Sequence, residues 1–258
     1  MTLRPFLLAS LVLAACSATA RADLVVGAGA ELQLSAGASV EMNGGTWDDS
    51  AGTLTCAATT LVTFQGTTSL KTGAANKFAD LTVASGTLTT DATGGDLEVT
   101  EDLAVAGGAT LKVSSGHQLL LSRVKGAWPP DTHVITGTLE IVGGNGTVTN
   151  VRLGNRQQLV VDGTLKVTTP ASGWSFPANR YVLFTNAANA NDGTGYSVWC
   201  RSSSIVFLEF VKFLYLYARS NGSNEDTEAV GAQSGFCFSG TAANFQRFMT
   251  LWFDWGVD

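Results

Sequence analysis

The feature that most constrains the fold is a short run of alternating apolar residues, followed by glycine, that recurs from Asp23 to about Thr169. Apolar residues at every second position are typical of β-strands with one buried face. Glycine supplies corners between strands, because it reaches positive φ without a steric penalty. No segment keeps the apolar spacing of a helix, so we expect almost no helix apart from the N-terminal signal segment. Clear examples of the runs are Leu103/Val105, Leu111/Val113, Leu139/Ile141 and Leu165/Val167.

The brevity and close spacing of these runs favour a solenoid over a β-sandwich. A sandwich usually has longer strands joined by Asn-Gly or Asp-Gly turns. Such dipeptides do occur, at Asn43-Gly44 and Asp162-Gly163 among others, so the sandwich stays open as an alternative. The repeated Gly-x-Leu-x-Val unit suits coils whose equivalent strands stack on one another. No proline lies between Asp23 and Trp128, which agrees with stacking because proline removes a ladder hydrogen bond.

Charged residues make up only 14% of the chain, against roughly 25% in an ordinary soluble domain. Threonine, serine, asparagine and glycine take their place. Stacked strands explain this, because like charges on neighbouring strands repel each other. The net charge of −6 argues against nucleic acid as a partner, which would require a basic patch or stripe.

Two segments carry a resemblance to a known family. Residues 62–70 read Val-Thr-Phe-Gln-Gly-Thr-Thr-Ser-Leu, and residues 76–89 contain Asn-Lys-Phe-Ala-Asp-Leu-Thr-Val and then Gly-Thr-Leu-Thr. This order of a Phe-x-Gly turn, a Phe-x-x-Leu-Thr-Val strand and a Gly-Thr-Leu strand resembles the repeat of exported bacterial surface or adhesin-type proteins. The resemblance is best over 61–113 and recurs weakly at 137–141 and 163–167. It implies an all-β, right-handed parallel β-helix (a β-solenoid) at the cell surface, and it implies no activity.

The first residues have the pattern of an export signal. Arg4 precedes an apolar stretch over 6–15, which has the length of a signal core and is too short to cross a bilayer. A small-x-small site at 20–22 predicts a signal peptide over residues 1–22. Alternatively, residues 13–16 resemble a bacterial lipobox, which would end the signal at Ala15 and make Cys16 a lipidated N-terminus with a lipid anchor. Both interpretations export the chain, to be secreted or held at the outer membrane or cell surface.

After the signal we expect solenoid repeats over 23–173. Residues 174–258 are richer in aromatic side chains and either continue the solenoid or form a second β unit; the aromatic end suggests a truncated chain, a partner or self-association. The long apolar run near 205–217 is too short and too charged for a transmembrane span. Of the cysteines beyond the signal, Cys200 and Cys237 are the expected disulfide pair, and Cys56 is expected to be a small buried residue.

Few residues carry the patterns of catalytic or metal chemistry. His117 and His133 share no motif and are interpreted as surface turn residues. Asp91 and Asp96 flank Gly94-Gly95 and could offer a Ca²⁺ site, although they match no known calcium loop, so solvated carboxylates are preferred and no cofactor is assigned. The acidic clusters are Asp48-Asp49, Asp91/Asp96/Glu98/Glu101/Asp102 and Glu225-Asp226 with Glu228; the scattered cations are Arg123, Lys125, Arg152 and Arg156.

The leading hypothesis is therefore a non-catalytic, exported bacterial β-solenoid that acts as a structural or adhesion module. Its Thr/Ser/Asn-rich wall would meet glycans or other cell-surface proteins. The first alternative is a carbohydrate-active β-helix enzyme, a polysaccharide lyase or a glycosidase, which needs carboxylates at a defined separation. The second is a glycan-binding β-sandwich over 174–258 on a solenoid stalk, and Trp128 is a candidate for stacking on sugars.

Overall fold

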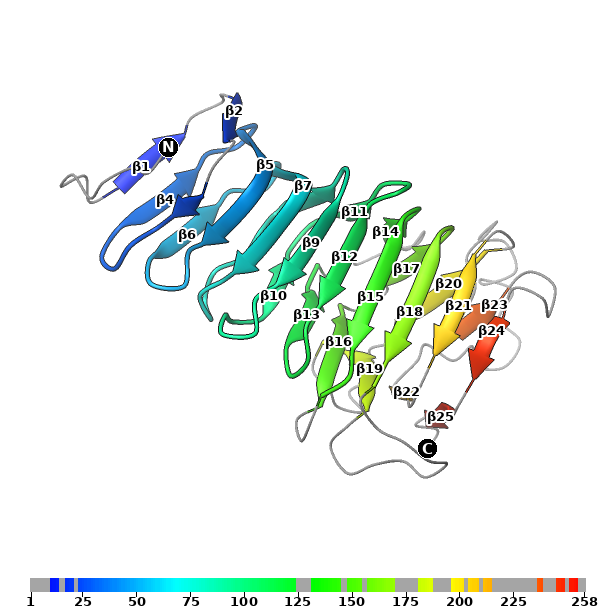
Figure 1. The fold of residues 1–258 in the computed structure, drawn as a ribbon. Helices are drawn as coiled ribbons and strands as arrows, with labels where there is room; N and C mark the ends of the chain where they lie inside the picture. Colours follow the sequence, from blue (N-terminus) through cyan, green and yellow to red (C-terminus); the bar gives the residue numbers. More distant parts are fainter. Residues whose placement is uncertain are drawn as a thin grey trace, which may run out of the picture.

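In the computed structural model the chain winds into a stack of β-coils along one axis, with the two termini at opposite ends (Figure 1). The structure describes residues 10–13, 17–20, 23–123, 131–144, 148–154, 157–169, 181–187, 196–201, 204–208, 211–214, 236–238, 245–248 and 251–254. Every regular element within these residues is a strand, and none of them is helical.

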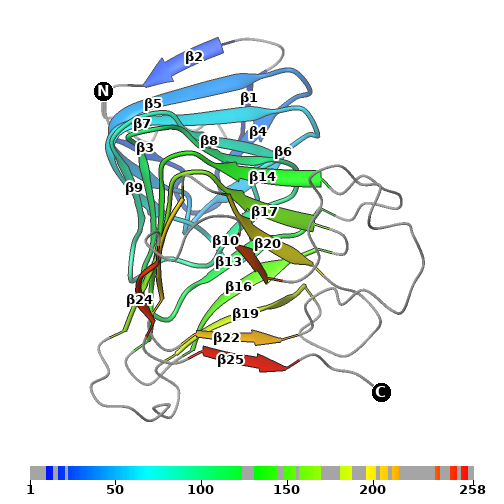
Figure 2. The ribbon, with the colours of Figure 1, turned by 90° about the vertical axis from the view of Figure 1, so that its right-hand side faces the viewer.

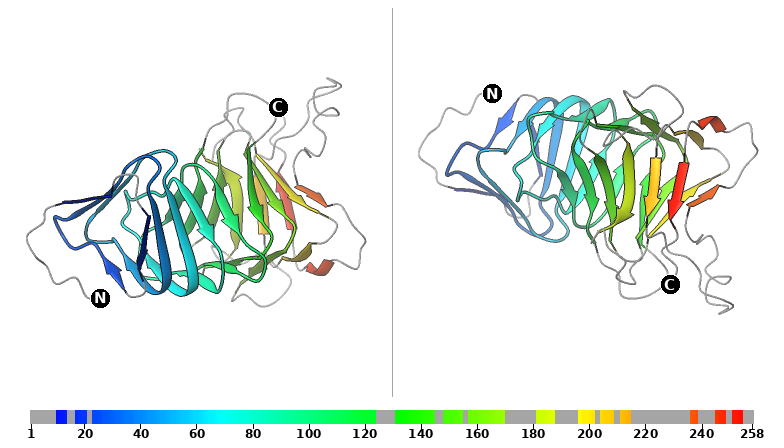
Figure 3. Two further views of the ribbon diagram at one scale, coloured as in Figure 1. Left: turned by 90° about the horizontal axis from the view of Figure 1, so that it is seen from above. Right: turned by 90° about the horizontal axis from the view of Figure 1, so that it is seen from below.

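The strands lie on three faces, which Figure 2 shows at an oblique angle to the axis and Figure 3 shows from above and below. The first face holds β1 (Ser10–Leu13), β4 (Glu31–Leu34), β6 (Thr53–Cys56), β10 (Leu97–Val99), β13 (Gln118–Leu121), β16 (Thr149–Leu153), β19 (Val182–Asn186), β22 (Val211–Leu214) and β25 (Leu251–Asp254).

The second face begins with β2 (Ser17–Ala20) and the first halves of β5 (Ser39–Asp48) and β7 (Leu61–Lys71). It continues with β8 (Asp80–Val83), β11 (Leu103–Val105), β14 (Asp131–Ile135), β17 (Gln157–Val161), β20 (Ser197–Cys200) and β23 (Phe236–Phe238).

The third face begins with β3 (Leu24–Val25) and the second halves of β5 and β7. It continues with β9 (Thr87–Thr90), β12 (Thr110–Val113), β15 (Thr138–Val142), β18 (Thr164–Thr168), β21 (Ile205–Leu208) and β24 (Phe245–Phe248).

Every described strand pair is parallel, and the three faces close around a shared interior, so the predicted all-β parallel β-helix is confirmed. The third face illustrates the stacking: Leu88, Leu111 and Leu139 are in register on successive coils and are fully buried. Successive side chains of a strand point to opposite faces, so the apolar residues at every second position all point inward. Stacked over several coils, they form a column in the interior.

Two features of the sequence prediction need correction. Helix was expected only in the signal segment, yet the described parts of that segment, β1 and β2, are strands that pair with β4 and β5. The sequence around Pro129-Pro130 also predicts a loop from Trp128 to His133, yet Asp131 to His133 already belong to β14. Trp128 itself lies outside the described residues.

The aromatic-rich part continues the same faces. Strands β19 and β22 follow β16 in register on the first face, while β20 and β21 extend the second and third faces. The larger side chains fill the interior: the rings of Phe184 and Phe213 stack with centroids 4.9 Å apart. The described strands of this part therefore extend the solenoid.

Glycine at the corner between the second and third faces is required by close backbone approach. A Cβ on Gly163 would overlap the Gly137 carbonyl oxygen, and a Cβ on Gly137 would overlap the Ala106 carbonyl oxygen. The same corner carries the ladder onward, because the Gly137 carbonyl accepts the N–H of Thr164 at 2.8 Å.

We therefore expect Gly163→Ala to destabilise the protein by about 2 to 3 kcal/mol, because its methyl group would have to push neighbouring backbone apart. Gly107→Ala is the matched control, since a Cβ at Gly107 meets nothing within 4 Å. Urea unfolding of both variants measures the difference. Equal midpoints for the two variants would contradict the close approach.

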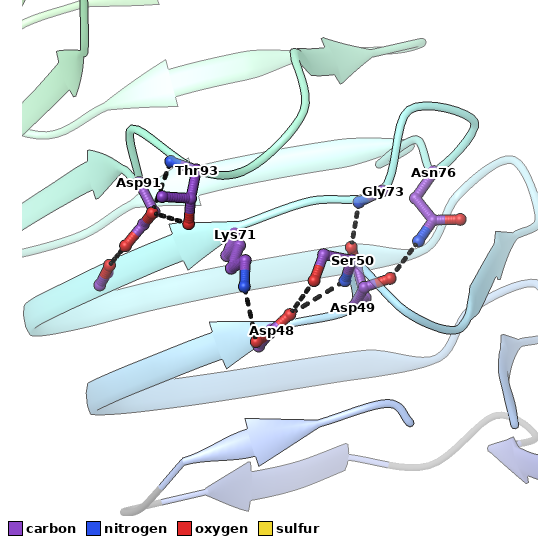
Figure 4. Close-up of polar contacts among 9 residues, drawn as sticks. Asp48, Asp49, Ser50, Lys71, Gly73, Asn76, Asp91 and Thr93 are labelled. Atoms are coloured by element: carbon purple, nitrogen blue, oxygen red, sulfur yellow. Dashed lines mark hydrogen bonds and ion pairs between the residues drawn. The ribbon is translucent and has the colours of Figure 1, made fainter. Parts of the chain in front are cut away.

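The first face is interrupted between β6 and β10, and Asn76 fills the gap. Its side-chain oxygen accepts the Leu54 N–H at 3.0 Å, and its amide nitrogen donates to the Asp49 carbonyl at 2.9 Å and to the Gly52 carbonyl at 3.3 Å. The buried Asp49 carboxylate completes this corner by accepting the Gly73 N–H at 2.8 Å (Figure 4). A buried side chain thus replaces the missing strand as a hydrogen-bond partner.

Replacing Asn76 by alanine should lower the free energy of unfolding by about 2 to 4 kcal/mol, because buried backbone groups would lose their partners. The exposed Asn43 provides the control, and Asn43→Ala should stay near the wild-type value. Thermal and urea denaturation measure both. If Asn76→Ala is as stable as Asn43→Ala, the bridging role is wrong.

Candidate functional site

The most regular surface of the molecule is the outward side of the third face, seen at the front of Figure 1. One threonine occupies the same position on each of five consecutive coils, and every neighbouring pair is in register. We call these residues the threonine column: Thr67, Thr87, Thr110, Thr138 and Thr164.

The column arises directly from the corner chemistry. Each coil turns onto the third face at a small residue, and the next residue must point outward because the one after it fills the interior. In three coils this gives the tripeptide Gly-Thr-Leu, at 86–88, 137–139 and 163–165. Parallel strands are about 4.8 Å apart, so the five hydroxyl groups extend over about 19 Å.

A second outward column runs beside the first, two residues further along each strand. It reads Ser69, Thr89, Lys112, Glu140 and Lys166 in register. The Glu140 carboxylate lies 3.2 Å from the Lys112 ammonium and 3.5 Å from the Lys166 ammonium. The charges therefore alternate along the axis. We call the two columns together the threonine wall.

Other charges on the coils pair in the same way. Asp48 and Lys71 are in register and form an ion pair at 3.6 Å, and the next acid, Asp91, accepts hydrogen bonds from the N–H and hydroxyl of Thr93 at 2.7 and 2.6 Å (Figure 4). Those Thr93 hydrogen bonds hold the pKa of Asp91 below its usual range. Asp96 instead accepts the Gln118 N–H at 2.8 Å.

The acidic residues that the sequence grouped are thus engaged with different partners. Glu98 pairs with Lys77 at 2.9 Å and accepts the Ser122 hydroxyl at 2.7 Å. Arg123 pairs with Glu101 and Asp102, each at 3.2 Å. No three carboxylate, histidine or cysteine side chains in the described part of the chain gather closely enough to hold a metal ion, and Ca²⁺ binding at Asp91 and Asp96 stays untested.

Both histidines differ from the sequence interpretation as surface turn residues. His117 is 7% exposed, and its Nδ1 lies 3.2 Å from the Gly95 carbonyl oxygen. His133 is fully buried, in register with the interior residue Leu159, and its Nδ1 accepts the Leu103 N–H at 3.2 Å. The strand that holds His133, β14, follows polar residues and two prolines that break the apolar alternation. The sequence pattern therefore does not predict this strand.

The two cysteines whose side chains the structure describes, Cys56 and Cys200, belong to or pack against the core. Cys56 is half-buried against the core, and burial raises the pKa of its thiol. The backbone register aligns Cys237 with Trp199, one residue before the buried Cys200. The side chain of Cys237 and all of Cys16 lie outside the described residues, so the disulfide and the lipidation stay predictions.

Of the remaining sequence candidates, the structure describes only Arg152. Arg152 donates to the Ala187 carbonyl at 3.5 Å. Lys125, Arg156 and the acidic group 225–228 lie outside the described residues. On the second face the outward column turns from polar to apolar toward the C-terminal end, through Ala104, Val134, Val160 and Trp199. The threonine wall is therefore the longest uniform polar surface in the described coils.

Comparisons with protein-family models, with curated proteins and with solved structures find no match to this chain. The fold itself defines the protein as a parallel β-solenoid. Within the described residues no helix is long and apolar enough to cross a membrane.

The alternating charges of the wall generate a stability prediction. We expect Glu140→Lys to destabilise the protein by about 1 to 2 kcal/mol at low salt, because three lysines would then stack in one column. The loss should shrink at high salt, since exposed charges are screened. Chemical denaturation at two salt concentrations measures it.

The control is Glu41→Lys, which makes the same charge change beside the uncharged Thr63. A loss of stability that is equal in both variants, or that does not respond to salt, would count against the charge pairing.

Proposed function

We propose that this chain is an exported, non-catalytic surface module whose threonine wall binds glycans. The observation that carries the proposal is the threonine column, five hydroxyl groups in register on consecutive coils. Each threonine offers a donor, two acceptor lone pairs and a methyl group. Sugars present the complementary mixture of hydroxyl groups and C–H faces.

The rigidity of the solenoid supports this assignment. The backbone ladder holds each threonine at a fixed spacing, so binding would not have to order the site. Single contacts of this kind are weak, and repetition along the wall supplies avidity. Glu140 pairs with both Lys112 and Lys166, so the wall keeps a balance of only one positive charge, and this small charge favours a neutral ligand over a strongly ionic one.

Export is the part of the proposal that rests on sequence. The signal-like residues 1–22 and the resemblance to bacterial surface repeats support a secreted or cell-surface location, with a lipid anchor at Cys16 as the alternative form of attachment. The mass of the chain recovered outside cells distinguishes cleavage after Ala22 from lipidation at Cys16.

The decisive experiment is a glycan array probed with the purified chain and with Thr110→Val/Thr138→Val. Valine keeps the shape and the strand preference of threonine while removing the hydroxyl. We expect the double variant to bind its glycan about thirtyfold more weakly, from two lost hydrogen bonds of about 1 kcal/mol each.

Thr63→Val/Thr82→Val is the matched control, because these two residues are in register and outward on the second face. It should bind like the wild type. Equal loss in both double variants, or no binding to any glycan, would contradict the assignment of the wall.

A carbohydrate-active enzyme is the second candidate, and one observation favours it. Glu98, Glu101 and Asp102 lie with Lys77 and Arg123 around the corner between the first and second faces. Glycosidases use carboxyl groups as catalytic residues, and a lyase uses a basic residue beside carboxylates. A hydrolase and lyase screen on the same glycans tests this, and turnover that is lost in Glu101→Gln would replace the non-catalytic assignment.

A further inference from the structure

The first complete coil of the solenoid is covered at its N-terminal edge by residues that the sequence assigns to the export signal. Strand β1 adds to β4, and β2 adds to the first half of β5, both in parallel. Strand β3 adds to the second half of β5. The edge of this coil therefore has three parts, and two of them are covered by the segment that export would remove.

The backbone of β4 shows that its outer edge is built to accept a strand. The carbonyls of Ala30 and Leu34 accept N–H groups of Thr53 and Ala57 from the next coil. Backbone groups alternate sides along a strand, so those of Glu31 and Gln33 face the other way, toward β1. On β5 the Ala38 carbonyl accepts the Leu61 N–H, so the groups of Ser39 and Glu41 face β2 by the same argument.

The register of the covering segment defines which strand fits. Leu11 and Leu13 align with Leu32 and Leu34, whose side chains are buried, and Ala18 and Ala20 align with the buried Val40 and Met42. The two paired stretches, Ser10–Leu13 and Ser17–Ala20, contain no charged residue. The edge therefore fits an uncharged extended segment with apolar residues at alternate positions.

The third part of the edge does not depend on the signal. The Asp23 carboxylate accepts the Thr46 N–H at 2.8 Å, and the Val26 N–H donates to the Asp48 carbonyl at 2.8 Å. A chain that starts at Asp23 keeps these contacts and loses only those of β1 and β2. Cleavage after Ala22 would thus uncover the edges of β4 and of Ser39 to Met42 together, while leaving β3 in place.

We propose that removal of the signal opens this edge as a docking site for an extended strand of another polypeptide. The strand adds in parallel to β4 and to the first half of β5, with main-chain hydrogen bonds for affinity and alternate apolar side chains for specificity. The inference rests on the proposed export, because only export removes the covering residues. An edge left open would otherwise invite uncontrolled pairing.

The test uses the full chain with a specific protease site inserted between Ala22 and Asp23, cut after folding. The probe is a labelled synthetic peptide of residues 9–22 with Cys16→Ser. Cutting and gel filtration should release the covering segment and increase hydrogen exchange at the amides of Glu31, Gln33, Ser39 and Glu41. Adding the peptide should restore protection with a stoichiometry of one peptide per chain.

Two substitutions make the test specific. Gln33→Pro removes an N–H that faces the docked strand and should weaken peptide binding about tenfold or more, while Gln33→Ala keeps that N–H and should bind normally. A probe with Leu11→Asp and Leu13→Asp should not bind, because these positions align with the buried Leu32 and Leu34.

Three outcomes would overturn the inference: unchanged exchange after release of the segment, no binding of the probe, or pairing of the cut chain with a second copy that already protects the edge. The peptide measurement is independent of glycan binding. The proposal that the threonine wall binds glycans can therefore be wrong while the proposal that the edge binds a strand is correct. A chain recovered outside cells with residues 1–22 still attached would overturn the processing on which the inference rests, whatever the array shows.

Discussion

The parallel, in-register ladder between successive coils is the interaction on which the whole structure depends. It places each coil directly on the one before. The contribution of any residue to stability therefore depends on its neighbours in the coils above and below as well as on its neighbours in the chain. Apolar residues gain from this, because Leu88, Leu111 and Leu139 bury one another. The same constraint puts glycine at the corners, where Gly163 lies against the Gly137 carbonyl.

Polar and charged residues obey the same ladder. Lysine and glutamate alternate at Lys112, Glu140 and Lys166, so stacking that would have opposed like charges instead pairs unlike ones. Where the ladder is interrupted, a side chain has to replace it. Asn76 does so between β6 and β10, and the buried His133 accepts a backbone N–H from Leu103 in the neighbouring coil. A low content of charge and a few buried polar side chains are thus two results of one geometry.

The proposed functions follow from the two kinds of surface that a solenoid presents. Its sides are regular, so a residue repeated at one position becomes a linear array, as the threonine column does. Its ends are open ladders, so each end must be covered by something that can pair. In this chain β1 and β2 cover the N-terminal coil, and they belong to the predicted signal. Side and end therefore suit different ligands, a glycan along the axis and a strand across it.

The strand content, the glycine corners and the stacked architecture can all be inferred from the sequence, because alternation and turn chemistry are local properties of the chain. The sequence also indicates a wall rich in threonine, since in each Gly-Thr-Leu unit the threonine lies between the corner glycine and the buried leucine. Which residues share a column becomes known only from the folded coils, because the coils differ in length and the register cannot be counted along the chain. For that reason the sequence pattern places His133 and His117 at the surface although both are buried, and it does not predict the bridging role of Asn76. The ion pairs of Glu140 and Arg123 likewise join residues from different coils, so they depend on the register.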